Sequence, residues 1–379
     1  MNNHVRKLDE FCEDLDADLK LPSTFKADKY RPERRGWSPF KPKIDGLTRL
    51  EMLEDYLQGR SLTWIAEKYR CSEKTANLAV IEAAKKVKKV LEVHDELVGK
   101  GYTFKSSHAI AMDLTNPPFN SMRRKEEFYP TIFVVCDAVY PRLPYCFAAY
   151  SYWPKDDELL EVVRKFALMS RRYNRAKIKQ VTLDDGINLI RILPDLLKEF
   201  PEAKPQISIF HTKRYVLKSL PLKNVSDKDV WIVRSIVRKS ADALLNCVSN
   251  PKHLRKWISR LRKVNDGVDG KTDEVLDKLD DLADYLTTYA ERGTGVKTTN
   301  QCEGIYSMLE GRISAMRGFK SIDSLCNITN AFLVYRLFQK FPTSRYREYK
   351  YRRPIDLCFS PSPRGTWTDH CFEEAIWDE

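Results

Sequence analysis

The sequence predicts an α/β protein built on one mixed sheet, with a small helical unit before the sheet and an all-helical insertion inside it. Three observations predict this class. Short β-branched or aromatic runs alternate with helical patterns between residues 130 and 211. Long, charged helical patterns fill residues 212–298, and shorter ones fill residues 47–98. Acids follow some of the expected strands, and ligands of α/β sheets usually bind at the edge where strands end.

The composition excludes several classes of protein. The chain has 379 residues, 42% of them hydrophobic, which suits a packed core in two or three domains and argues against global disorder. The formal net charge of +12 favours a polyanionic partner, with nucleic acid ahead of an acidic membrane surface. The nine cysteines show no C-x-x-C pair or zinc spacing, so we expect reduced thiols in an intracellular protein. The charged N-terminus does not resemble a signal peptide, and no membrane span is expected.

The N-terminal part is expected to contain a linker and three helices. Residues 1–46 form a segment whose second half is basic and holds four prolines, as in a linker or an arm along DNA. Helices are expected over residues 49–58 and 62–69. Ser72 is expected to cap a third helix over residues 73–97.

The stretch Ser61–Val80 resembles a helix-turn-helix DNA-binding unit, so residues 47–98 are expected to form such a domain. In that unit the third helix enters the major groove. The resemblance therefore places Lys74 and Asn77 at base edges, with Lys85 near phosphates or in solvent. A generic three-helix bundle is the alternative.

The sheet is expected to form from residues 130–211, after an irregular connection over residues 99–129. Helices are expected over residues 156–173 and 187–200. The strands are expected between and beside them, over residues 131–136, 145–153, 178–183 and 206–210. Asp137 follows the first strand, Asp184 and Asp185 follow the third, and His211 follows the fourth.

The sheet domain is expected to be interrupted and then resumed. Residues 212–298 predict an insertion of helices near residues 230–248, 253–264 and 273–291. The basic run over residues 252–263 is a candidate for phosphate contacts or a solvated face. Residues 299–341 then return to the core, and the basic tail over residues 342–379 has no assigned structure.

The helix that follows Thr299 carries the third acid of interest. Apolar residues recur at helical spacing after it, and Gly318 is expected to end the helix. Glu303 lies in the first turn, where the helix dipole favours a carboxylate. Taken alone, Glu303 reads as a solvated acid on an amphipathic helix. Taken with Asp137 and Asp185, it predicts a metal site.

Carboxylates that meet at a sheet edge are costly to bury together unless cations pair with them. Oxygen ligands suit Mg²⁺ or Mn²⁺, and two such ions about 4 Å apart can run in-line phosphoryl transfer. A strand-end Asp is also a common turn residue. Asp184 stays open as the alternative to Asp185, because strand alternation points only one of two neighbours inward.

Two stretches resemble insertion-sequence DDE transposases, of the bacterial, archaeal and Mutator-like type, which have a ribonuclease-H-like catalytic core. The family's last motif is N-x-x-E, then a basic residue and M-x-G-F-K-S. The residues that match it are Asn300, Glu303, Arg312, Met316, Gly318, Phe319, Lys320 and Ser321. The middle of the family is matched by Asp185, Gly186, Gln206, His211 and Arg214. The likeness covers about residues 130–340.

The resemblance implies a ribonuclease-H-like mixed sheet and a DNA transposase that cleaves and joins strands at the ends of a mobile element. It implies two Mg²⁺ or Mn²⁺ ions, with Asp137 bridging them and Asp185 and Glu303 each holding one. Arg214, Arg312 and Lys320 become expected DNA contacts, and His211 an auxiliary residue. The implied partners are double-stranded DNA and further copies of the chain, in a prokaryotic nucleoid or a eukaryotic nucleus.

One position departs from the family pattern. Many relatives carry Lys or Arg seven residues after the last acid, where Glu310 stands here, and a carboxylate would repel a phosphate. Arg312 is one substitute for that cation. Two further interpretations follow: a transposase-derived DNA-binding regulator without catalytic activity, and a structure-specific nuclease that does not join strands.

Overall fold

The computed structural model describes residues 44–116, 130–173, 178–184, 187–315, 321–341 and 347–372. The chain divides into two units, Met1–Ile44 and Asp45–Glu379, and the fold described below is that of the second unit. The predicted N-terminal linker lies almost wholly outside the described residues. In the described part of the chain, no helix is both long and apolar enough to cross a membrane.

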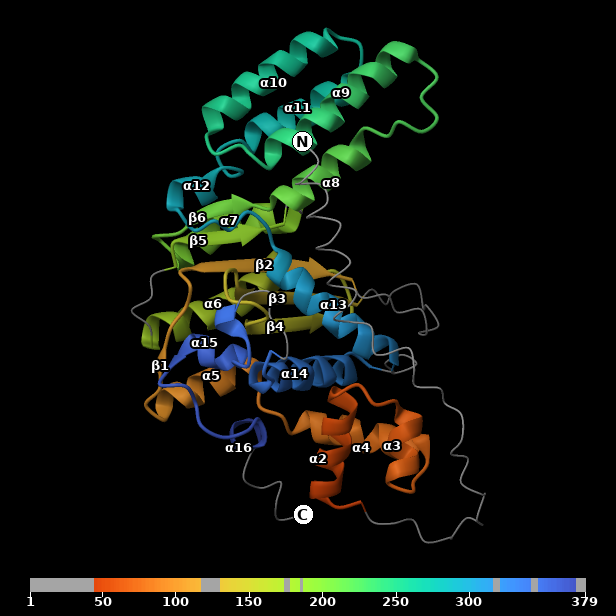
Figure 1. The fold of residues 1–379 in the computed structure, drawn as a ribbon, viewed down its shortest axis with the longest axis vertical. Coiled ribbons are helices and arrows are strands. Elements are labelled where there is room, and N and C mark those ends of the chain that lie inside the picture. The colour runs from red at the N-terminus through yellow and green to blue at the C-terminus, as the bar shows by residue number, and fades with distance from the viewer. Residues whose placement is uncertain are drawn as a thin grey trace. The chain divides into compact units, whose positions relative to one another are not determined.

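A mixed five-stranded sheet lies at the centre of the second unit (Figure 1). Its order is β4-β3-β2-β5-β6. Strand β2 pairs with β5 in parallel and with β3 antiparallel, while β5–β6 is parallel and β3–β4 antiparallel. The strands are β2 (Ala109–Thr115), β3 (Thr131–Asp137), β4 (Pro144–Tyr150), β5 (Gln180–Leu183) and β6 (Lys204–Ile207). The predicted α/β class with a mixed sheet is therefore confirmed.

The central strand was not expected. Strand β2 lies within residues 99–129, which the sequence predicted to be an irregular connection. Its first five residues, Ala109–Asp113, are all buried. A strand covered on both faces shows no alternation of polar and apolar residues, and alanine has little preference for strands. The sequence signal of β2 is therefore weak, although the strand is the middle of the sheet.

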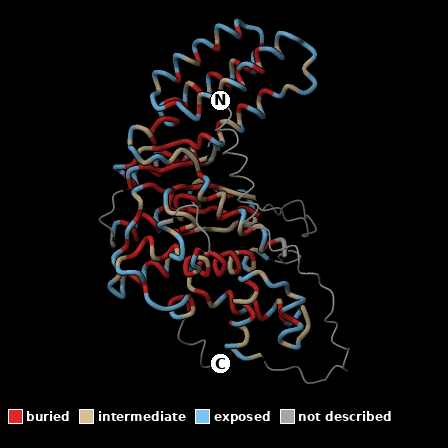
Figure 2. Tube along the Cα trace, viewed as in Figure 1, coloured by how far each residue is buried: buried red, intermediate tan, exposed pale blue. Residues whose placement is uncertain are grey.

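Helices cover the sheet. Helices α6 (Asp156–Tyr173) and α7 (Ile187–Glu199) pack on each other and on β4 and β6, as the sequence predicted for this part of the chain. Helix α13 (Asn300–Ala315) packs on β2 and β3, and α14 (Ile322–Phe338) packs on β4. Figure 2 shows the buried residues concentrated in the sheet and in α14, which is apolar around most of its circumference.

The N-terminal helical unit contains α2 (Gly46–Leu57), α3 (Leu62–Lys68) and α4 (Glu73–Lys85). Ser61 and Ser72 cap α3 and α4, because each hydroxyl accepts a backbone N–H bond of 3.1 Å at the first turn. The long third helix predicted up to residue 97 is wrong. The chain instead breaks after α4 and resumes as α5 (Val90–Gly99).

The break between α4 and α5 has a tertiary cause. The buried side chain of Asn330 on α14 donates hydrogen bonds to the carbonyls of Val87 (3.1 Å) and Lys88 (3.0 Å). It also accepts one from the N–H of Val90 (3.1 Å). These bonds satisfy backbone groups that a continuous helix would have paired internally, and they join α14 to the start of α5.

The predicted helical insertion consists of five helices within residues 209–292, which the structure describes without a gap. They are α8 (Ile209–Ser219), α9 (Lys228–Leu245), α10 (Pro251–Asn265), α11 (Gly270–Asp281) and α12 (Thr288–Arg292). Strand β6 ends earlier than predicted, so His211 lies in the first turn of α8 rather than at a strand end.

The C-terminal tail also folds back. Strand β7 (Phe359–Ser360) pairs with β1 (Thr103–Phe104), and short helical segments flank it. These are η1 (Arg347–Tyr349), α15 (Pro354–Cys358) and α16 (Thr368–Cys371). The sequence had assigned this tail no structure.

A fully buried histidine lies between the β1–β7 pair and the sheet. The ring of His94 stacks on Phe359 and meets Phe104 and Tyr145 edge-on, with centroid distances of 5.7–5.9 Å. Its Nε2 lies 3.1 Å from the Pro144 carbonyl, so Nε2 carries the proton, while buried Nδ1 has no partner. Burial lowers the pKa of His94 to about 4, because the charged ring would lose its hydration.

The folded protein should therefore lose stability as the pH falls from about 6.5 to about 4. In this window the unfolded chain binds a proton at His94 that the folded chain excludes, so protonation favours unfolding. The loss amounts to at most about 3 kcal/mol over the window. Urea unfolding between pH 7.5 and 4.5 measures it, with His94→Gln as the non-titrating comparison. If the difference in unfolding free energy between wild type and His94→Gln does not change with pH, His94 is not the group that destabilises the protein at low pH.

Candidate active site

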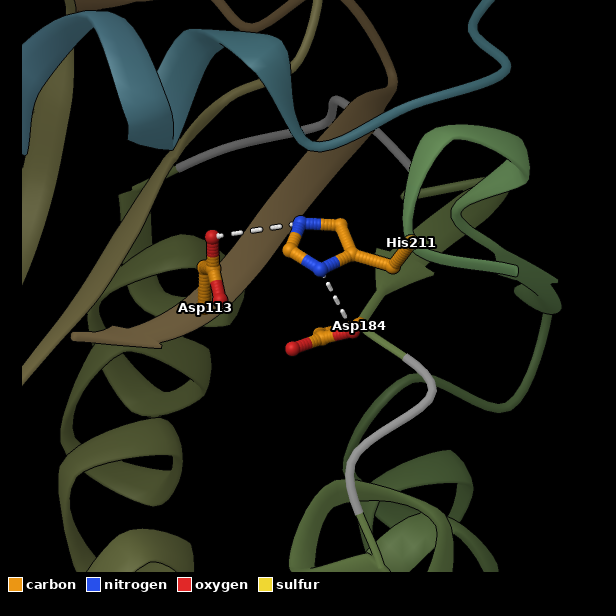
Figure 3. Close-up of side chains that lie close together, drawn as sticks. All are labelled: Asp113, Asp184 and His211. Carbon is orange, nitrogen blue, oxygen red and sulfur yellow. Dashed lines mark ion pairs between the residues drawn. The ribbon is translucent and has the colours of Figure 1, made fainter. Parts of the chain in front are cut away.

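Four side chains from distant parts of the chain meet at one edge of the sheet. Asp113 lies on β2, Asp184 directly follows β5, His211 is in the first turn of α8, and Glu303 is in the first turn of α13. The parallel register of β2 and β5 pairs Met112 with Leu183, one residue before each Asp. Neighbouring parallel strands therefore deliver both Asp residues to the same edge (Figure 3).

The first turn of α13 is held close to β2. One residue before Glu303, the Sγ of Cys302 lies 3.3 Å from the Sγ of Cys136 on β3. Three residues after Glu303, the Tyr306 hydroxyl donates to the backbone carbonyl of Asp113 (2.5 Å). These two contacts fix Glu303 beside the end of the central strand.

His211 lies between the acids. Its Nδ1 is 2.9 Å from Asp184 Oδ1, and its Nε2 is 2.9 Å from Glu303 Oε1 and 4.0 Å from Asp113 Oδ2. Burial lowers the pKa of His211, but the bonds to Asp184 and Glu303 and the charge of Asp113 outweigh it and raise the pKa to about 10. Both ring nitrogens then donate, and the imidazolium is the counter-ion of the three carboxyl groups.

Asp113 is the most strongly perturbed acid of the cluster. It is only 2% exposed. Burial and the negative charges of Asp184 and Glu303 raise its pKa to about 8, against the opposing effects of His211 and the Leu114 N–H. A buried carboxyl group of this kind gains from a nearby cation.

The donor set fits a divalent metal ion. One ligand atom each from Asp113, Asp184 and His211 lies within 4.8 Å of the others. Glu303 contacts the Nε2 of His211. Carboxylate oxygens suit Mg²⁺ and Mn²⁺. If His211 releases the proton of one ring nitrogen, it would add an imidazole ligand, which Mn²⁺ and other transition ions accept more readily than Mg²⁺. The cluster can thus hold a divalent metal ion, the kind of ligand that the sequence predicted.

A cleft of about 900 Å³ opens above the acids. Arg214 and Lys218 of α8 line it and are exposed, one helical turn apart. The exposed aromatic side chains of Trp153 and Phe210 line it as well. The cleft therefore combines an acidic floor with cations that can bind phosphate groups and with flat apolar surfaces.

Glu310 also lines the cleft, on the same face of α13 as Glu303. Burial raises its pKa, which favours the neutral form of a group that would otherwise repel phosphate.

The predicted first acid, Asp137, is not part of the cluster. It ends β3 and pairs with Ile110, whereas Asp113 pairs with Val134, so the two acids are three residues apart along the sheet, about 10 Å. The reason is topological. Strand β3 runs antiparallel to β2, so its C-terminal end reaches the opposite edge of the sheet.

The Asp137 carboxylate is fully engaged in structural hydrogen bonds. Its Oδ1 accepts from the N–H groups of Val139 (2.8 Å) and Tyr140 (2.7 Å). Its Oδ2 accepts from the Ser107 N–H (2.9 Å) and the Tyr145 hydroxyl (2.6 Å). This is the turn-residue role that the sequence had left open.

The other predicted site residues divide into three groups. Glu303, His211 and Asp184, the alternative to Asp185, are brought together in the cluster. Asp185, Gly186 and Lys320 lie outside the described residues. Gln206 is buried and structural, because its amide bonds to the backbone of Ile207, Leu286 and Tyr289.

The predicted DNA contacts lie in different parts of the molecule, and only some of them line the cleft. Arg214 lines the cleft. Arg312 does not, because it lies nine residues after Glu303 and so on the opposite face of α13. On α4, Lys74 and Lys85 are exposed and Asn77 is half-buried.

The basic run over residues 252–263 is partly neutralised. Arg255 pairs with Asp284 (2.6 Å) and Arg262 with Asp277 (2.7 Å), so these two cations hold α10 to its neighbours in the insertion.

Comparison with known proteins gives little. No family model matches the chain, and no curated protein does. Two solved structures show a weak likeness. The Mos1 strand transfer complex is 10% identical with a TM-score of 0.23 and covers 68% of this chain and 81% of its own. A pre-cleavage Mos1 transpososome is 12% identical with a TM-score of 0.22 and covers 74% and 87%. A TM-score of this size does not establish a common fold, so neither structure is used to infer the function of this chain.

The cluster should bind Mn²⁺ through Asp113 and Asp184. We expect Asp113→Asn and Asp184→Asn each to weaken binding at least about tenfold in isothermal titration, because each removes an anionic ligand. Asp137→Asn is the matched control and should leave the affinity unchanged in the folded protein, with folding checked by circular dichroism. Equal affinity in wild type and Asp113→Asn, or loss of binding in folded Asp137→Asn, would contradict this site.

Proposed function

We propose that this protein is a DNA transposase that cleaves and joins DNA strands in a metal-dependent reaction, with Asp113 in the role that the sequence gave to Asp137. One observation carries the proposal. Asp113, Asp184 and Glu303 come from three distant segments and converge on one sheet edge, at the floor of a cleft bordered by cations. Carboxylates gathered in this way are typical of phosphoryl-transfer sites.

The chemistry follows from the donor set. Divalent ions bound here would activate a water or a 3′-hydroxyl and stabilise the leaving oxygen in an in-line displacement. Asp113, Asp184 and Glu303 would hold such an ion. Arg214 and Lys218 would bind the backbone phosphates that flank the reacting one.

The N-terminal helices support the DNA assignment. Exposed Lys74 and Lys85 on α4 suit a recognition helix, with Asn77 between them. The unit is tied to the core, because the Tyr56 hydroxyl of α2 donates to the Arg312 carbonyl of α13 (2.7 Å). In this proposal α2, α3 and α4 find the end of the element, the ribonuclease-H-like core performs the chemistry, and two or more copies assemble to join two ends.

A second candidate is a DNA-binding regulator that has lost catalysis. Glu310 favours it, because a carboxyl group in the cleft opposes a phosphate unless it is protonated. The intact acid cluster favours the enzyme, since a regulator has no need of perturbed acids at a cleft floor.

The protein should cleave duplex DNA that carries the sequences flanking its own gene, in Mg²⁺ or Mn²⁺. We expect Asp113→Ala, Asp184→Ala and Glu303→Ala each to lower the cleavage rate at least about 100-fold, because each removes a ligand that also organises the others. Asp137→Asn should keep the wild-type rate per folded molecule. Labelled oligonucleotides on denaturing gels report both cleavage and joining.

The same assay separates the alternatives. Joined products support the transposase, and cleavage without joining supports a nuclease. Sequence-specific binding without cleavage in either metal supports the regulator. Cleavage that survives in Asp113→Ala but is lost in folded Asp137→Asn would contradict the proposed site.

A further inference from the structure

Two half-buried arginines lie where α13, α14 and the end of α2 meet. Arg312, in the last turn of α13, lies directly over Gly59, which follows α2. A Cβ at Gly59 would be only 2.8 Å from the Arg312 Cζ, so a larger residue would displace the guanidinium, and the φ of +106° also favours glycine there. The Tyr56 hydroxyl holds the backbone of Arg312 from the same side.

Arg336, near the end of α14, approaches the same face of α13. It donates to the thioether sulfur of Met308 at 3.3 Å. Met308 precedes Arg312 by four residues, so the two lie on one face of the helix. The two guanidinium groups therefore belong to one neighbourhood, on the face of α13 opposite Glu303.

Neither guanidinium has an anionic partner in the part of the chain that the structure describes. Among the described residues, no carboxylate forms an ion pair with Arg312 or Arg336, and the Met308 sulfur is only a weak acceptor. Burial, together with the positive charges of Arg142 and Arg312, lowers the pKa of Arg336 to about 10. The half-buried Arg234 and Arg353 instead lie 2.7 Å from the carboxylates of Asp269 and Asp356.

A half-buried cation cluster without an anion is costly, since desolvation and like-charge repulsion both oppose it. We propose that Arg312 and Arg336 form a phosphate-binding site between the N-terminal helical unit and the core. Guanidinium groups suit this role because their planar forks bind phosphate oxygens in pairs. A bound phosphate group would neutralise the cluster and join α2, α13 and α14.

The expected source of the phosphate is the DNA backbone. The site adjoins the unit that carries exposed Lys74 and Lys85, and it lies on α13, the helix that carries Glu303 in its first turn. This source rests on the proposed function, whereas the phosphate site itself does not. Free phosphate is the other source with the same chemistry.

Thermal unfolding of the full chain tests the site. At equal ionic strength, inorganic phosphate should raise the Tm above its value in chloride by about 2 °C or more, because it binds only the folded protein. The gain should vanish in Arg336→Met and in Arg312→Met, and shrink in Arg312→Lys, which keeps the charge but loses the fork. Lys198→Met, which removes an exposed cation of α7, is the control and should keep the gain.

The variants also separate this site from a purely structural role. Without phosphate, Arg336→Met should raise the Tm, since it removes an uncompensated charge, whereas loss of a structural arginine would lower it. Binding to a random-sequence DNA duplex identifies the source. The salt slope is the change of log K for DNA binding with log salt concentration. If the source is DNA, Arg312→Met and Arg336→Met should each make this slope shallower by about one unit.

The outcomes are distinct. Stabilisation by phosphate with an unchanged salt slope assigns free phosphate, and a reduced slope assigns the DNA backbone. If phosphate gives no more stability than chloride and the salt slopes of Arg312→Met and Arg336→Met match that of Lys198→Met, the site does not exist. Neither result depends on cleavage, so failure of this inference and failure of the proposed function remain distinguishable.

Discussion

The parallel pairing of β2 with β5 decides which acids of this chain can meet. Because both strands run in one direction, the residues that follow Met112 and Leu183 lie side by side at one edge of the sheet. Strand β3 runs the other way, so the acid at its end is carried to the opposite edge and serves a turn there. One choice of strand direction thus separates a candidate catalytic acid from a structural one.

The electrostatics of the cluster follow from that pairing. The three neighbouring carboxyl groups would repel one another when ionised. His211 offsets this repulsion, because its two ring nitrogens contact Asp184 and Glu303. The imidazolium occupies the position among the acids that a metal ion would also favour. The cation cluster of Arg312 and Arg336 is the opposite case, since there the described residues supply no counter-charge.

Part of this site could be predicted from the sequence. Glu303 was found because the first turn of a strongly patterned helix is easy to locate. His211, and Asp184 as the alternative to Asp185, were found because they adjoin β-branched runs. Asp113 was missed, since a central strand buried on both faces and rich in alanine gives no alternation. Asp137 was grouped with the other acids because sequence does not reveal whether neighbouring strands run parallel. The break after α4 was missed because Asn330, far along the chain, causes it.

The position of a bound metal ion tests the central claim most directly. Crystals grown or soaked with Mn²⁺ would give an anomalous difference peak at the site. We expect that peak within about 2.5 Å of carboxylate oxygens of both Asp113 and Asp184, with the Asp137 carboxylate still bound to its own turn. A peak coordinated by Asp137, or a fully occupied ion that touches neither Asp113 nor Asp184, would contradict the account.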